Sequence, residues 1–135
     1  MDVQAVVDET VMAGLDDVIQ ASEVAFISME IGGAQTDDQV AELSIAAVRE
    51  LLLRGWMEAG GFIRLDSPQS GSRGRWEWVR WDVPSSEAAE RIEREWRALG
   101  HRPDLGELFW LKNTELGNET ARKLFAQRDE GEDNV

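Results

Sequence analysis

Hydrophobic residues recur every three or four positions in several segments of this chain, which is the pattern of amphipathic helices. The clearest case begins at Thr36, where Thr36 and Gln39 form a capping-box pattern. Asp37 and Asp38 follow the cap and suit the positive end of a helix dipole. Apolar residues then recur three or four positions apart, so the pattern predicts a helix over residues 37–58, which the glycines at 55, 60 and 61 end or fray.

Two shorter segments precede this helix. Residues 10–21 show helical spacing, whereas residues 22–31 are apolar enough to be either a helix or a buried strand. We expect a helix in the second segment, because Ser22 and Glu23 resemble an N-cap followed by a first-turn acid. The residues that fit both structures are Val24, Phe26, Ile27 and Ile31.

The second half of the chain mixes strands and helices. Residues 62–83 read as two strands around a loop rich in Gly and Ser, and the segments that follow read as helix, strand and helix. The expected order is α-α-α-β-β-α-β-α, an α+β fold that is mainly helical. Residues 1–128 would form one domain, and the charged, apolar-poor residues 129–135 a disordered acidic tail.

The stretch RGRWEWVRW holds three of the six tryptophans. Neighbouring side chains in a strand point to opposite faces, so Trp76 and Trp78 are exposed if Val79 and Trp81 face the core. Two exposed tryptophans form an apolar patch of the size that often binds partners. Alternatively the helix over residues 86–99 covers them, a bulge changes the register, or a second copy of the chain pairs here as a homodimer.

The net charge of −13 is unevenly distributed. Residues 1–60 carry 12 acidic and 2 basic side chains, whereas residues 61–128 carry 11 acidic and 12 basic ones. Such acidity favours solubility and also a basic protein partner. It makes DNA an unfavourable partner, because affinity for DNA comes largely from Lys and Arg that displace counterions.

The sequence offers few groups for enzyme chemistry. It has no cysteine and a single histidine, His101, so it lacks thiolate nucleophiles and the usual ligands of a zinc site. No phosphate-binding or calcium-binding loop motif occurs. We therefore expect no catalytic residue, no metal and no cofactor, and a protein that is not an enzyme.

The expected location is the cytoplasm. The N-terminus lacks the basic segment of a secretory signal, and no apolar run reaches the roughly 18 residues of a membrane helix. The absence of cysteine fits a reducing compartment. We expect a soluble protein that does not associate with membranes.

The stretch AVRELLLRGWMEAGGFI looks like the end of the third helix of a winged-helix domain running into its first wing strand. FWLKNTELGNETARKL is similar to the strand, turn and closing helix of winged-helix proteins. Together with RIEREWRALGHRPDLGELFWLKNTELG, they make residues 20–128 resemble a group of small uncharacterised proteins from high-GC bacteria. The resemblance implies a winged-helix-like fold and no catalytic residue.

In a DNA-binding winged helix the third helix enters the major groove. Here residues 37–58 are net negative, which would repel phosphates. We therefore expect a protein-interaction module of the immunity, antitoxin or accessory-regulator kind that binds a basic protein. Its candidate contact residues are Asp37, Asp38, Glu42, Trp76 and Trp78.

The alternative function is a DNA-binding transcriptional regulator that contacts phosphates through the basic hairpin alone. Such a wing supplies few phosphate contacts, and affinity scales with their number. The candidate residues for this alternative are Arg64, Arg73, Arg75 and Arg80.

Overall fold

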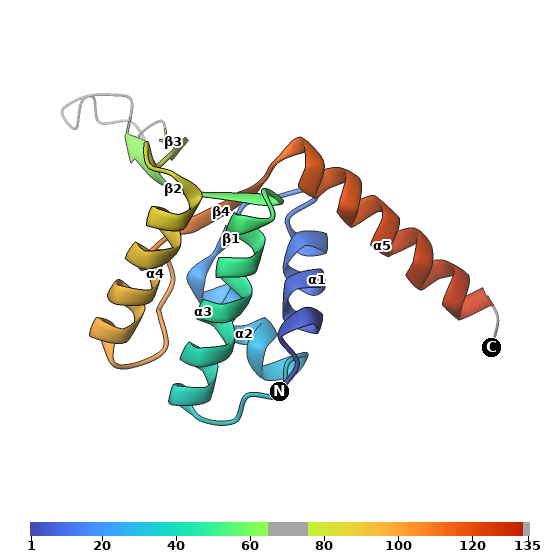
Figure 1. Ribbon diagram of the computed structural model, residues 1–135, viewed down its shortest axis with the longest axis horizontal. Helices are drawn as coiled ribbons and strands as arrows, with labels where there is room; N and C mark the ends of the chain where they lie inside the picture. The colour runs from blue at the N-terminus through green and yellow to red at the C-terminus, as the bar shows by residue number, and fades with distance from the viewer. Residues whose placement is uncertain (65–75, 134–135) are drawn as a thin grey trace, which may run out of the picture.

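In the computed structural model, which describes residues 1–64 and 76–133, five helices accompany a four-stranded antiparallel sheet. Four of these helices lie side by side beneath the sheet, and α5 leaves the body (Figure 1). The elements are α1 (Val3–Ala13), β1 (Ile19–Gln20), α2 (Ala21–Glu30), α3 (Asp37–Leu53), β2 (Met57–Arg64), β3 (Trp76–Arg80), α4 (Ser85–Leu99), β4 (Trp110–Asn113) and α5 (Glu115–Asp133).

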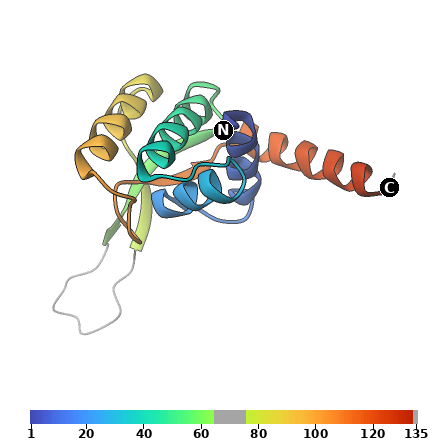
Figure 2. The same ribbon diagram turned by 90° about the horizontal axis from the view of Figure 1, so that it is seen from below.

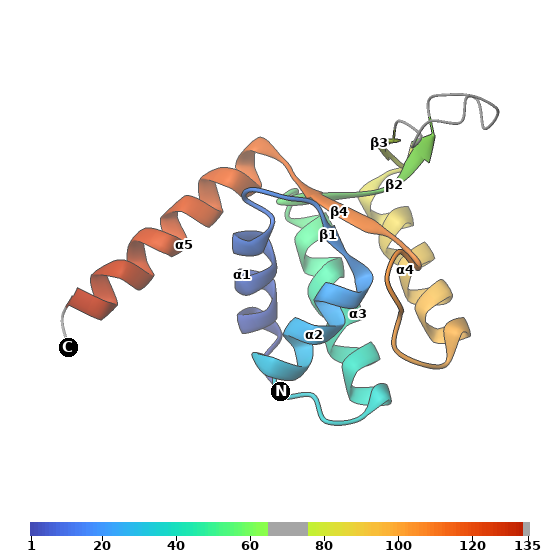
Figure 3. The ribbon, with the colours of Figure 1, turned by 180° about the vertical axis from the view of Figure 1, so that it is seen from behind.

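The α+β, mainly helical fold is confirmed, with one addition to the expected order and one change of bounds. The helical spacing over residues 10–21 does not mark the first helix, because α1 spans Val3–Ala13. The strand β1, only two residues long, lies between α1 and α2. It pairs with β4, which in turn pairs with β2, so the strands lie in the order β1-β4-β2-β3 (Figure 3). A two-residue strand carries no periodicity of its own, and only its pairing with Trp110 and Leu111 identifies it.

Helix α3 begins where the sequence predicts. Thr36 Oγ1 accepts a hydrogen bond of 3.2 Å from Gln39 N. The helix ends at Leu53 instead of residue 58, because Gly55 adopts a left-handed conformation with φ 73° and turns the chain into β2. It packs against α1, α2 and α4, and its buried residues are Val40, Leu43, Ser44, Ile45, Ala47, Val48, Leu51 and Leu52.

The ambiguous segment after β1 is a helix, as expected. Helix α2 starts at Ala21, so Ser22 lies inside the first turn and is not the cap. Glu23 still caps the start of the helix, because its Oε1 accepts a hydrogen bond of 3.4 Å from Gln20 N.

The two faces of the sheet differ in burial. Ile19, Leu111 and Ala59 are partners in the strand register, so they share a face, and all three are buried against the helices. The residues between them along the strands share the opposite face, which we call the outer face. Apart from Gly60, its members are exposed or half-buried, among them Gln20, Glu58, Phe62, Trp78, Trp110 and Lys112.

Helix α5 is anchored at its start and then extends away from the other helices, in a direction different from that of the β2–β3 hairpin (Figure 2). Ala121 is buried, and Arg128 pairs with Glu9 of α1 at 2.8 Å. The sequence predicts a disordered acidic tail over 129–135, but α5 continues to Asp133. Residues 126–133 hold no Pro or β-branched residue, so an anchored helix propagates through them.

None of the helices in the described ranges 1–64 and 76–133 has both the length and the apolar character that a membrane span needs.

Candidate functional site

The outer face of the sheet carries four aromatic side chains from three strands. Phe62 of β2 lies opposite Trp78 of β3, and Trp76 occupies the next outer position along β3. Trp110 of β4 lies opposite Gly60, so it shares the same face. We call Phe62, Trp76, Trp78 and Trp110 the aromatic face.

Contacts within the sheet hold most of this surface in place. The rings of Phe62 and Trp110 meet edge to face, with centroids 5.0 Å apart. Trp78 Nε1 donates a hydrogen bond of 3.5 Å to the backbone oxygen of Trp110, and Lys112 Nζ lies 5.3 Å from the Trp78 ring centroid. The Trp78 ring also covers Gly60, where an added Cβ would lie 2.9 Å from two ring atoms.

The two predicted tryptophans differ in exposure. Trp76 has 61% of its surface exposed, whereas its neighbours on the face leave Trp78 half-buried. On the opposite side of β3, Val79 is 40% exposed. Trp81 packs against the core, and Arg91 of α4 covers it with its Cζ 3.7 Å from the ring centroid.

An open groove of about 780 Å³ runs along the aromatic face. It arises because β4 begins only at Trp110, while β2 continues beyond Gly60. Leu108 has φ 70°, a rare conformation for a residue other than glycine, and it turns the chain away from β2. From the outer face Phe62, Trp76 and Trp110 line the groove, and from elsewhere it is lined by residues that include Asp17, Leu108, Trp81 and Arg91.

The backbone of β2 faces this groove at Phe62. Trp81 N donates a hydrogen bond of 3.0 Å to Ala59 O, which fixes Ala59 and Trp81 as a hydrogen-bonded pair. Hydrogen-bonding direction alternates along an antiparallel strand, so the amide and carbonyl of Phe62 point away from β3. They point to the side on which β4 is absent, and the groove therefore exposes strand backbone as well as aromatic rings.

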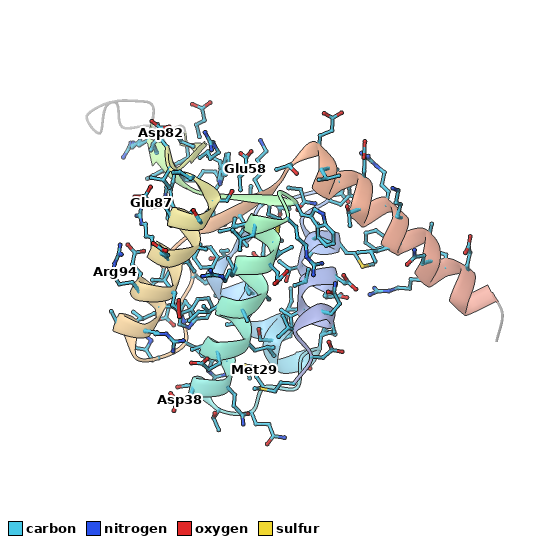
Figure 4. All side chains as sticks on the ribbon, in the orientation of Figure 1. Met29, Asp38, Glu58, Asp82, Glu87 and Arg94 are labelled. Atoms are coloured by element: carbon cyan, nitrogen blue, oxygen red, sulfur yellow. The ribbon has the colours of Figure 1, made fainter. Side chains whose placement is uncertain are left out.

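The predicted acidic residues lie elsewhere. Asp37, Asp38 and Glu42 are in the first turns of α3, at the opposite end of the molecule from Glu58 and Asp82 near the hairpin (Figure 4). Helix α3 has 17 residues and therefore spans about 25 Å. The structure thus divides the five predicted contact residues between two separate surfaces.

Arginines of the same chain already engage two of these acids. Asp37 pairs with Arg102 at 2.8 Å, and Glu42 accepts a hydrogen bond of 2.6 Å from Arg97. This bond and the charge of Arg97 lower the pKa of Glu42, and the pKa of Arg97 is raised by its bonds to Glu42 and Glu93. Asp37 and Glu42 line a pocket of about 400 Å³ between the start of α3 and the end of α4.

The basic hairpin is seen only in part. Arg73 and Arg75 lie outside the described residues. Arg64 is exposed at the end of β2, and Arg80 lies 3.8 Å from Glu58. The winged-helix resemblance implies that α3 enters the major groove of DNA. Because α4 packs on α3, little of the surface of α3 is free for such contacts.

Sequence reasoning missed Asp17, Phe62 and Trp110 as site residues. A strand alternation starting at Gly60 would have placed Phe62 with Trp78, but the sequence gives no sign of which strand lies beside β2. The start of β4 and the turn at Leu108 decide the groove, and both depend on tertiary packing.

Within residues 1–64 and 76–133, no three His, Asp or Glu side chains cluster in a way that could hold a metal ion. Comparisons with protein-family models, with curated proteins and with solved structures found no match to this chain. The functional proposal therefore rests on the geometry of the site.

Proposed function

We propose that this protein is a non-enzymatic interaction module that binds an extended basic segment of another protein along the groove of the aromatic face. The observation that carries the proposal is the groove itself, which lies between strand β2 and the turn at Leu108 and is lined by aromatic rings. Its volume of about 780 Å³ falls within the range of ligand-binding pockets.

An extended occupant suits the backbone geometry. The amide and carbonyl of Phe62 point to the side where β4 has ended, so a peptide strand laid there gains main-chain hydrogen bonds. The rings of Phe62, Trp76 and Trp110 then offer contacts for alternate side chains of that peptide.

A basic occupant suits the charge. The chain has a net charge of −13, which attracts cations at long range. Asp17 supplies a carboxylate at the groove itself, where Arg91 is the balancing cation of the lining. The protein also pairs cations with its own tryptophans, as Arg91 does with Trp81. Within the described part of the chain, Trp76 and Trp110 have no such cation over their rings, so they are available to Lys or Arg of a partner.

The acidic start of α3 has a supporting role in this proposal. Asp37 and Glu42 are held by arginines, so Asp38 and the general acidity attract the partner without forming its main contact. An immunity, antitoxin or accessory regulatory role on a winged-helix-like scaffold is consistent with this mode of binding, because each requires one protein to mask or recruit another.

The test begins with selection from a displayed library of random peptides. We expect enrichment of extended sequences that contain Lys or Arg, and we expect Asp17→Lys to weaken a selected peptide about tenfold in calorimetry. Asp38→Lys is the matched control, because it makes the same charge change at the far end of α3. Equal losses in both variants, no enrichment, or enrichment of acidic peptides would contradict the proposal.

DNA binding remains the second candidate, and the exposed position of Arg64 beside the aromatic face is the observation in its favour. Fluorescence anisotropy with a random DNA duplex at about 50 mM salt separates the two functions. Tight binding that weakens steeply with salt would support the regulator, and a flat titration would exclude it.

A further inference from the structure

The strand β3 forms one edge of the sheet. It pairs with β2 on one side, and no other strand of residues 1–64 and 76–133 lies on its other side. Native proteins protect such edges with short strands, prolines, bulges or inward-pointing charges, because an open edge pairs readily with another chain.

This edge carries exposed apolar side chains on both faces, beside the charged residues Glu77 and Arg80. Trp76 on the outer face is 61% exposed, while Ile63 and Val79 on the opposite face are 49% and 40% exposed. Among the described residues, these are the exposed large apolar side chains of the sheet, and all three belong to the hairpin. Apolar surface gathered at a pairing edge is typical of an interface.

Backbone geometry determines which residues of β3 could pair outward. Trp81 N donates to Ala59 O, so by alternation Val79 and Glu77 also exchange hydrogen bonds with β2. The amides and carbonyls of Trp76, Trp78 and Arg80 therefore point away from the sheet. We propose that two copies of this chain pair through their β3 strands, antiparallel, about a two-fold axis at Trp78.

The side chains are complementary in this arrangement. Pairing centred on Trp78 sets Trp76 of one copy opposite Arg80 of the other, twice by symmetry. A guanidinium beside an indole ring forms a cation–π contact, which the chain already makes between Arg91 and Trp81. On the opposite face Glu77 meets Val79, and the exposed Val79 loses contact with water.

Charge also favours this edge. Two copies with a net charge of −13 each repel over most of their surfaces, but on the two strands of the hairpin Arg64 and Arg80 balance Glu58 and Glu77. Approach through this neutral edge therefore meets less repulsion than approach through the acidic surfaces of the chain. Because salt screens the remaining repulsion, added salt should strengthen the dimer, whereas it weakens contacts between opposite charges.

The dimer does not depend on the proposed function. The two proposals share Trp76, which lines the groove and would face Arg80 of the other copy in the dimer. Phe62, Trp110 and Asp17 of the groove lie away from the paired edge, and the pairing joins two four-stranded sheets into one. Variants of Asp17 therefore report on peptide binding, while variants of the β3 edge report on self-association.

Analytical ultracentrifugation of the full chain from about 1 to 500 µM tests the pairing. We expect a concentration-dependent dimer that Val79→Lys disrupts, shifting the dissociation constant at least about tenfold. Leu116→Lys is the matched control, because Leu116 is also exposed, at 50%, but lies on α5. A monomer throughout this range, or equal effects of both variants, would overturn the proposal.

A spin label tests the register independently. The chain contains no native cysteine, so Glu77→Cys can be labelled alone. Antiparallel pairing centred on Trp78 brings the two labelled positions within roughly 10 Å, and their EPR spectra should broaden in the dimer. A label at Glu119→Cys on α5 should stay sharp. A dimer in which the Glu77→Cys label stays sharp would place the interface elsewhere.

Discussion

Glu42 of α3 accepts a hydrogen bond of 2.6 Å from Arg97 of α4, across 55 positions of sequence. Arg97 also bonds Glu93 of its own helix at 3.2 Å, so one guanidinium joins the two helices at a solvent-exposed point. The predicted partner-binding acid Glu42 is thereby part of the internal structure of the protein.

This bond predicts a pH-dependent stability difference. The pKa of Glu42 is lowered from 4.5 in the folded protein, so the folded state binds its proton less readily than the unfolded state. The stabilisation is therefore fully present above the unfolded-state pKa and is lost as the pH falls through the folded pKa. We expect Glu42→Gln to lower the urea midpoint slightly at neutral pH, with the difference vanishing in acid.

The matched control for this measurement is Glu90→Gln, which removes an exposed acid of α4. Because the Glu42–Arg97 pair is itself exposed, added salt should shrink the effect of Glu42→Gln. If Glu42→Gln still lowers the urea midpoint below the folded-state pKa of Glu42, the hydrogen bond to Arg97 is not the cause of the lower midpoint.

Ser28 of α2 and Ser44 of α3 predict a double-mutant cycle. Their hydroxyls lie 2.7 Å apart, and both residues are fully buried. Replacing either serine with alanine leaves the other hydroxyl without this partner, which costs about 1–3 kcal/mol. The double variant loses both polar groups, so urea unfolding should give a cost well below the sum of the two. Additive costs would contradict this coupling.

Two glycines of α5 should respond in opposite directions to alanine. A Cβ at Gly117 would overlap the backbone oxygen of Trp56, so Gly117→Ala should destabilise the protein by about 1–3 kcal/mol or more. Gly131 has open space around it, and Gly131→Ala should stabilise the helix by up to about 1 kcal/mol. Thermal unfolding and circular dichroism measure both. No gain in helix content for Gly131→Ala would favour the disordered tail that the sequence predicts.

The contact between Arg91 and Trp81 predicts a difference between two arginines of α4. Arg91 lies over the Trp81 ring and pairs with Glu95 at 3.1 Å. Arg91→Ala should therefore cost about 0.5–1 kcal/mol and change the tryptophan fluorescence of the folded state. Arg94→Ala, on the exposed side of the same helix (Figure 4), should change neither quantity measurably. Identical results for the two variants would show that the stacking contributes nothing.

The sequence by itself determined the local elements whose signals are short-range. Thr36 and Gln39 set the start of α3, and the helical spacing of the apolar residues that follow predicted the helix itself. Such signals are readable because a helix makes its bonds and its apolar stripe within a few residues.

Only the tertiary structure decided the candidate site. The two-residue strand β1 and the late start of β4 depend on pairing between distant segments. The arginines that engage Asp37 and Glu42 come from α4 and the loop after it. The alternation of side chains along a strand determines which of them share a face. Whether that face is buried depends on which other elements pack against it, and no local sequence pattern encodes that packing.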